Sequence, residues 1–236
     1  MANYELIFIR HGEHKGGDCI IPELTADGVA EAKKIGNELS INRFDDFVAF
    51  AVNSPRYIGT VALVMLPSLD VSEVENISEQ LIQEKKIIAD DDLDYRPMSN
   101  KQFKIDMMTA FNSSQAMGFI VNESDKYLSN DNLSTYKTMS RLMARKILST
   151  TSNSIYCSKE LMSPSLRAKI TLMRYGQKAV KDYVNWYMKN EEWNPEARTH
   201  ITKIQTDGEK YLLKDSYGEI DFNKKILSDI GEQDIE

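Results

Sequence analysis

A short apolar run that ends in a basic, glycine-containing turn constrains the fold of this chain most. Residues 6–13 read LIFIRHGE, and four consecutive apolar residues are typical of a central strand covered on both faces. In open parallel sheets, ligands bind just outside the carboxyl ends of the strands. Arg10 and His11 would stand at that edge as a cation beside an imidazole, and Gly12 would let the backbone approach a ligand closely. The alternative is a strand that simply ends in a polar turn.

Two further segments repeat this pattern of a buried strand, a polar tip and a helix. Residues 47–52 (FVAFAV) predict a second strand, which ends at 53–56 (NSPR), where a helix begins. Residues 169–174 (KITLMR) predict a third strand, with Tyr175 at its tip and a helix over 178–189. Strands that alternate with helices indicate a parallel sheet. We therefore expect an α/β fold, a three-layer α/β/α sandwich with a mostly parallel central sheet.

Local patterns predict four more elements. Thr25 suits the N-cap of a helix whose alanine and glycine residues would pack closely on the sheet. Residues 87–89 predict a short strand, and residues 134–148 an amphipathic helix. Asp207 followed by Gly208 is the turn of a closing β-hairpin.

The length of the chain and the absence of a linker-like segment indicate one domain. With 236 residues, of which 42% are hydrophobic, the chain can form a sizeable core. We expect a single domain over residues 1–236, with a possible cap insertion around 98–133. The acidic end, 226–236, is expected to fray.

Charge and cysteine content exclude several classes of function. The net charge of −7 argues against a nucleic-acid partner and against an anionic membrane surface, so any anion site must be a local basic pocket. Cys19 and Cys157 are the two cysteines, and their spacing fits neither a disulfide framework nor a zinc site. We see no signal peptide and no membrane-spanning run, and we expect a cytoplasmic protein.

Together these segments resemble the signatures of the histidine phosphatase superfamily, in its phosphoglycerate mutase-like branch 1. The tip at residues 10–13 (RHGE) resembles the first motif of that family, and residues 24–28 (LTADG) resemble its first-helix pattern. Residues 54–56 (SPR), followed by Thr60, resemble its second arginine site, with two residues fewer between the serine and the arginine. The resemblance implies a phosphoglycerate mutase-like fold and is thin over residues 67–165.

The resemblance implies a phosphomonoester hydrolase that acts through a phosphohistidine intermediate at His11. Its substrate would be a small phosphorylated metabolite or a phosphoprotein. Arg10 and Arg56 would hold the phosphoryl oxygens, because planar guanidinium groups match phosphate geometry. An acidic residue protonates the leaving oxygen in that family, and here Asp92 is the candidate, with Asp94 as the alternative. No metal or organic cofactor is implied, and the oligomeric state is not predicted.

The chain departs from the family pattern at the second histidine. Tyr175, at the tip of the predicted third strand, takes that place, and its hydroxyl can donate a hydrogen bond to phosphate but carries no charge. His14, in the loop after His11, would either contact the phosphate or lie on the surface. The alternative function is therefore a catalytically impaired relative that binds a phosphorylated ligand or partner.

Overall fold

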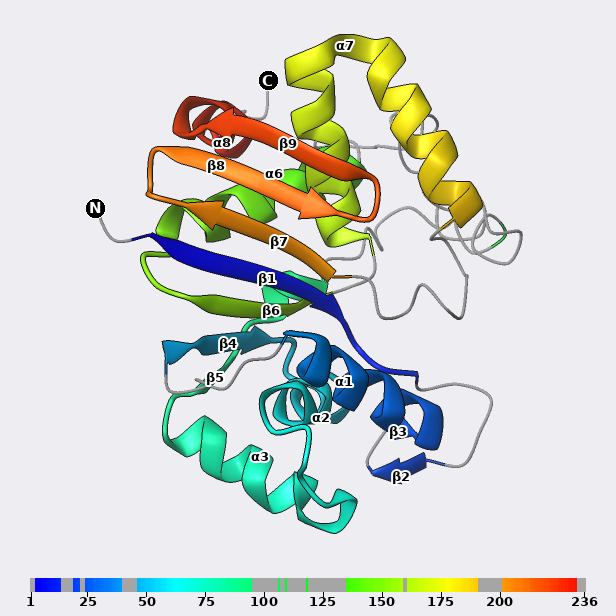
Figure 1. Ribbon diagram of the computed structural model, residues 1–236, viewed down its shortest axis with the longest axis vertical. Coiled ribbons are helices and arrows are strands. Elements are labelled where there is room, and N and C mark those ends of the chain that lie inside the picture. The colour runs from blue at the N-terminus through cyan, green and yellow to red at the C-terminus, as the bar shows by residue number, and fades with distance from the viewer. Residues whose placement is uncertain are drawn as a thin grey trace.

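The centre of the molecule is one seven-stranded sheet in the order β5-β4-β6-β1-β7-β8-β9 (Figure 1). The computed structural model describes residues 3–13, 19–21, 24–39, 46–94, 106, 109, 118, 135–158, 161–190 and 201–232. The strands of the sheet are β1 (Tyr4–Arg10), β4 (Val48–Ala51), β5 (Ile87–Ala89), β6 (Ser154–Ser158), β7 (Ile201–Thr206), β8 (Lys210–Asp215) and β9 (Gly218–Asn223). A separate small pair consists of β2 (Cys19–Ile21) and β3 (Leu24–Thr25).

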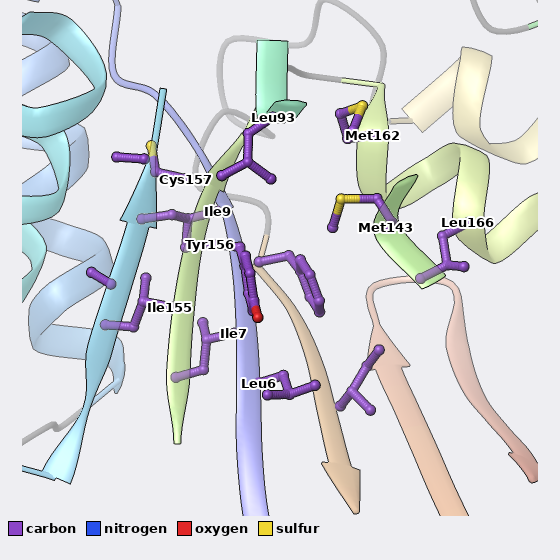
Figure 2. Close-up of a cluster of buried hydrophobic side chains, with 14 of the residues drawn as sticks. Leu6, Ile7, Ile9, Leu93, Met143, Ile155, Tyr156, Cys157, Met162 and Leu166 are labelled. Carbon is purple, nitrogen blue, oxygen red and sulfur yellow. The ribbon is translucent and has the colours of Figure 1, made fainter. Parts of the chain in front are cut away.

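The helices form two groups that lie on opposite faces of the sheet (Figures 1 and 2). One group contains α1 (Ala26–Leu39), α2 (Pro55–Met65) and α3 (Val74–Gln83), in which α2 packs on both of the others. The other contains α6 (Thr135–Ser149), α7 (Met162–Asn190) and α8 (Lys224–Gly231), in which α6 packs on both of the others. Two short 3-10 helices are η2 (Val71–Glu73) and η3 (Asp91–Asp94). The predicted α/β fold of three layers is confirmed.

Strand β1 divides the sheet into a parallel and an antiparallel part. It pairs in parallel with β6, which pairs in parallel with β4, and β4 with β5. On its other side it pairs antiparallel with β7, and the β7-β8-β9 meander continues antiparallel. The carboxyl ends of β5, β4, β6 and β1 therefore lie at one edge of the sheet, where parallel strands place their ligand sites.

The core is built by alternation along these parallel strands. Phe8, Phe50 and Tyr156 stack across β1, β4 and β6, with ring centroids 5.0 and 5.1 Å apart, on the face that α6 covers. Ile7 and Ile155 point to the opposite face, which α1 and α2 cover (Figure 2). Burial on both faces explains why these strands read as continuous apolar runs in the sequence.

Helix α1 begins as the sequence predicts. The Thr25 hydroxyl oxygen accepts a hydrogen bond from the Gly28 backbone N–H at 3.1 Å, which is the expected N-cap contact. Gly36 has a different role from the one expected, because it packs on α2 and not on the sheet. A Cβ atom at Gly36 would lie 2.4 Å from the carbonyl oxygen of Val64, so this glycine allows the two helices to approach closely.

The predicted strand at 169–174 is wrong, because these residues belong to α7. The buried residues Met162, Leu166 and Ile170 recur every fourth position, and this helical spacing outweighs the local β-branched residues. The fourth parallel strand is β6, of which all five residues are buried. Gly176, with φ +81°, interrupts the helical backbone of α7.

The acidic end of the chain is more ordered than expected up to residue 232. The Asn223 side-chain oxygen accepts the N–H of Ile226 at the start of α8, and Leu227 and Ile230 are buried. Residues 233–236 lie outside the described residues, as does the predicted insertion at 98–133 apart from positions 106, 109 and 118. None of the helices in the described part of the chain is both long enough and apolar enough to cross a membrane.

Candidate functional site

The predicted polar tips of the first two strands meet at the carboxyl edge of the parallel strands. His11 directly follows β1, and α2 starts with Pro55 and Arg56 after β4. Between these two strands lies β6, whose last residue, Ser158, stands opposite Arg10 in the register. The edge therefore gathers an imidazole and two arginines from segments that are more than forty residues apart in the sequence.

The His11 side chain is held in one orientation. It is 5% exposed, and its Nδ1 atom lies 2.9 Å from the carbonyl oxygen of Gly12. A carbonyl oxygen can only accept a hydrogen bond, so Nδ1 carries the hydrogen, and Nε2 of the neutral ring keeps its lone pair. A neutral imidazole nitrogen of this kind can attack a phosphoryl group.

The backbone amides beside His11 are used within the protein. The Gly12 N–H donates to the Thr60 hydroxyl oxygen at 3.0 Å, and that hydroxyl donates to the Arg56 carbonyl oxygen at 2.6 Å. The Glu13 N–H donates to a Glu31 carboxylate oxygen at 3.0 Å. These contacts give Thr60 a structural reason for its place four residues after Arg56. They also mean that an anion beside His11 must be bound mainly by side chains.

Gly12 is required by a close approach of two backbone segments. A Cβ atom at Gly12 would lie 2.4 Å from the carbonyl oxygen of Gly28, and one at Gly28 would lie 2.4 Å from that of Glu13. No side chain larger than hydrogen fits between the turn after β1 and the first turn of α1. The two glycines thus fix the position of the loop that carries His11.

Arg56 is a cation whose charge is matched by no carboxylate among the described residues. Among the described residues its side chain has no hydrogen-bond or ion-pair partner, although its Nε atom is buried. A buried donor that lacks an acceptor costs free energy, and a bound anion would supply the missing acceptor. The Arg56 guanidinium carbon lies 5.1 Å from the centre of the Tyr57 ring.

The sequence analysis did not predict Tyr57, whose ring contacts both Arg56 and His11. Its ring is fully buried and lies 4.7 Å from the His11 ring, at an interplanar angle of 66°. The same ring contacts the guanidinium of Arg56. The sequence signal for this contact was an aromatic residue directly after the arginine, in the first turn of α2.

The acidic residues after β5 are arranged around Lys146 of α6. The Lys146 ammonium lies 2.6 Å from a carboxylate oxygen of Asp90 and 3.0 Å from one of Asp92. Burial alone would lower the pKa of Lys146, but hydrogen bonds to the two carboxylates outweigh it, and the pKa is raised. The Asp91 carboxylate does not contact Lys146 in this way. It accepts a hydrogen bond from the backbone N–H of Asn53, which follows β4.

This arrangement bears on Asp92, the predicted proton donor. Its side chain is 61% exposed and is ion-paired with Lys146. A general acid must be able to reach the leaving oxygen. Asp92 lies at the expected edge of the sheet, after β5, but its carboxylate is paired with Lys146 of α6. The side chain of Asp94 lies outside the described residues.

The structure does not place Tyr175 at a strand end, and that expectation is wrong. Tyr175 belongs to α7 and is 57% exposed, and its ring lies 5.7 Å from the guanidinium carbon of Arg174. The strand end that does lie beside Arg10 is Ser158 of β6, which is buried and which the prediction missed. Its sequence signal was a run of only three apolar residues, 155–157. His14 lies outside the described residues.

No group of three or more histidine, cysteine, aspartate or glutamate side chains in the described ranges is arranged to hold a metal ion. In the part of the edge that carries His11, the described cations are Arg10 and Arg56, whereas Lys146 is paired with Asp90 and Asp92. Guanidinium groups suit an anionic ligand better than a cationic one.

No protein-family model matches the chain, and no curated protein matches it. A similar solved structure is a phosphoserine phosphatase from Entamoeba histolytica in complex with 3-phosphoglyceric acid. Its sequence identity is 15% and its TM-score is 0.46, and the match covers 85% of this chain and 90% of that chain. A putative α-ribazole-5′-P phosphatase from Escherichia coli has 14% identity, coverage of 93% and 95%, and a TM-score of 0.45. A mycobacterial glucosyl-3-phosphoglycerate phosphatase has 12% identity, coverage of 87% and 92%, and a TM-score of 0.42. At TM-scores this low, these likenesses establish neither the family nor the activity of this chain.

Proposed function

We propose that this chain hydrolyses phosphomonoesters through a phosphohistidine formed at His11, as the resemblance to histidine phosphatases implies. One observation carries the proposal. Arg56, a cation without a protein partner among the described residues, and His11, an imidazole whose Nδ1 contacts the Gly12 carbonyl oxygen, lie against the same tyrosine ring. A nucleophile beside an unneutralised guanidinium suits attack on a phosphoryl group.

In the proposed reaction Nε2 of His11 attacks phosphorus, and the bond from phosphorus to the ester oxygen breaks. Arg10 and Arg56 stabilise the charge on the phosphoryl oxygens, and His14 remains a predicted further contact. Water then cleaves the bond from Nε2 to phosphorus and releases inorganic phosphate. Asp92 remains the predicted donor of the leaving-group proton because of its place after β5, where its carboxylate is paired with Lys146.

The alternative is a protein that binds a phosphorylated small molecule or phosphoprotein without turning it over. One feature of the described residues favours it: the ion pair with Lys146, which occupies the carboxylate of Asp92, the predicted proton donor. Loss of a general acid can lower a rate by about 10²–10⁴-fold. A site of this kind would still bind phosphate.

The test is hydrolysis of an aryl phosphate from pH 5 to 8 by wild type and His11→Ala, together with trapping of an acid-labile phosphoenzyme. We expect turnover in wild type and a loss of about 10³-fold or more in His11→Ala. Equal turnover in both proteins would contradict the proposal. No turnover in wild type, with inorganic phosphate binding that Arg56→Ala weakens, would establish the binding function instead.

A further inference from the structure

We propose that Tyr57 is a positioning residue that sets the placement of His11 and Arg56 relative to each other. The inference rests on the proposed function, in which those two residues are the nucleophile and a phosphate clamp. It concerns a residue that neither touches the phosphorus nor supplies a proton in the reaction.

The first step is that the ring of Tyr57 contacts both groups. Its centre is 4.7 Å from that of the His11 ring, in an edge-to-face arrangement, and 5.1 Å from the guanidinium carbon of Arg56. Both contacts belong to classes that are attractive beyond the burial of area: edge-to-face aromatic pairs and cation–π pairs. One rigid side chain therefore contacts both reacting partners of the site.

The second step is that each partner depends on this ring for its orientation. His11 is held at Nδ1 by the Gly12 carbonyl oxygen, and its ring rests on Tyr57. The contact with Tyr57 is the only interaction of the Arg56 side chain with a described residue, apart from packing. Before a ligand arrives, the ring is what keeps the guanidinium in place, and an ordered side chain binds with a smaller entropic cost.

The third step is that the side chain of Tyr57 is enclosed by its neighbours. It is fully buried in the first turn of α2, on a helix whose Gly59, Thr60 and Val61 are also buried. Thr60 ties that turn to Gly12, next to His11, through the hydrogen bond to the Gly12 N–H. The tyrosine and the histidine loop are thus fixed to each other by two separate contacts.

The experiment compares Tyr57→Phe, which keeps the ring, with Tyr57→Leu, which removes it, and with Leu63→Val as a control at a buried α2 position away from the site. The chain contains only three histidines, so the His11 imidazole proton resonances can be identified from their loss in His11→Ala. The readouts are these NMR shifts, the affinity for inorganic phosphate, and kcat and KM for the aryl phosphate.

We expect Tyr57→Phe and Leu63→Val to keep the wild-type His11 shifts and phosphate affinity. Tyr57→Leu should shift the His11 resonances through loss of the ring current. It should also weaken phosphate binding by about three- to tenfold, the cost of ordering one long side chain. It should lower kcat by about tenfold to a hundredfold, because small misplacements of a reacting group have effects of that size. If Tyr57→Leu does not fold, Tyr57→Met tests the same loss of the ring.

Wild-type His11 shifts and phosphate affinity in Tyr57→Leu would overturn the inference. So would an equal loss in Tyr57→Phe, because the hydroxyl and not the ring would then be responsible. These two readouts do not need catalysis. Absence of turnover in wild type would therefore overturn the proposed function and leave the role of Tyr57 to be decided by the resonances and the phosphate affinity.

Discussion

Arg56 and Arg167 both lie against tyrosine rings, and they differ in what balances their charge. The guanidinium carbon of Arg167, in α7, lies 5.6 Å from the centre of the Tyr183 ring and 5.2 Å from that of Tyr217. Its Nη1 donates to the Asp215 carboxylate at 2.8 Å, and both side chains are at most 4% exposed. Arg56 has a similar ring contact but no carboxylate partner among the described residues.

The difference separates an arginine whose charge is matched inside the protein from one whose charge is matched by no described residue. Arg167 also donates to the Gly218 carbonyl oxygen at 2.9 Å, so it joins α7 to the turn between β8 and β9. Its contact with Tyr183 bridges the two halves of α7 across the interruption at Gly176. A charge that is matched inside the protein stabilises the fold, whereas the unmatched charge of Arg56, at the carboxyl edge of the parallel strands, is available to an anion.

The largest effect should come from breaking the matched pair. Arg167→Met leaves the Asp215 carboxylate buried without its cation, and we expect the free energy of unfolding to fall by about 3–5 kcal/mol. Urea denaturation measures this loss. Arg174→Met is the control, since its ion pair with Asp221 is largely exposed and should contribute less than about 1 kcal/mol. A similar small loss in both variants would remove the contrast between the two arginines.

The next effect concerns the unmatched arginine. Arg56→Ala removes a charge-assisted donor, and we expect inorganic phosphate to bind about tenfold to a hundredfold more weakly. The free energy of unfolding should change by less than about 1 kcal/mol, because no carboxylate of the described part of the chain loses its partner. Calorimetric titration with phosphate and urea denaturation give the two numbers. A stable fold with unchanged phosphate affinity would show that Arg56 is not the clamp.

A smaller effect is expected at Asp92, the predicted proton donor. The oxygen that leaves an aryl phosphate is weakly basic and needs little protonation, so Asp92→Asn should lower kcat for this substrate by less than about fivefold and clearly more for an alkyl phosphate. Steady-state rates with the two substrates from pH 5 to 8 measure the difference. An equally small loss with both substrates would contradict the role of Asp92 as the donor.

The smallest effect is a pH dependence of stability from Lys146. Its pKa is raised in the folded state, so the folded protein holds this proton more tightly than the unfolded chain. The stabilisation is fully present below the unfolded pKa of about 10.4 and is lost as the pH rises through the folded value. The difference between wild type and Lys146→Met in the free energy of unfolding should be constant from about pH 7 to 9 and shrink above about pH 10.4. A difference that stays constant beyond that point would argue against the ion pairs.

Much of the fold could be predicted from local pattern, and so could the positions of His11 and Arg56 in the candidate site. The predicted strands around residues 6–9, 47–52 and 87–89 are confirmed as β1, β4 and β5, and the Asp207 hairpin as β7 and β8. Each of these carries a clear apolar run or a turn signal in a few residues. His11 and Arg56 lie at the predicted edge because parallel strands bring their carboxyl ends together.

The false strand at 169–174 and the missed strand β6 have one physical cause: tertiary packing outweighed local propensity. Residues 169–174 contain the β-branched Ile170 and Thr171 and read locally as a strand, but they complete a buried helical stripe that starts at Met162. The short segment that forms β6 becomes a strand because β1 and β4 supply partners on both sides. Tyr175 was assigned to the site only because it followed the wrong segment.

The sequence by itself determined the elements whose signals are local: the apolar strands, the cap at Thr25 and the polar tips that carry His11 and Arg56. Only the tertiary structure decided that β6 lies beside β1, that Tyr57 contacts His11, and that Asp215 matches the charge of Arg167. These contacts join residues that are tens to more than a hundred positions apart. Local propensity carries no information about such pairs, because packing and the pairing of buried charges select them only when the whole chain has folded.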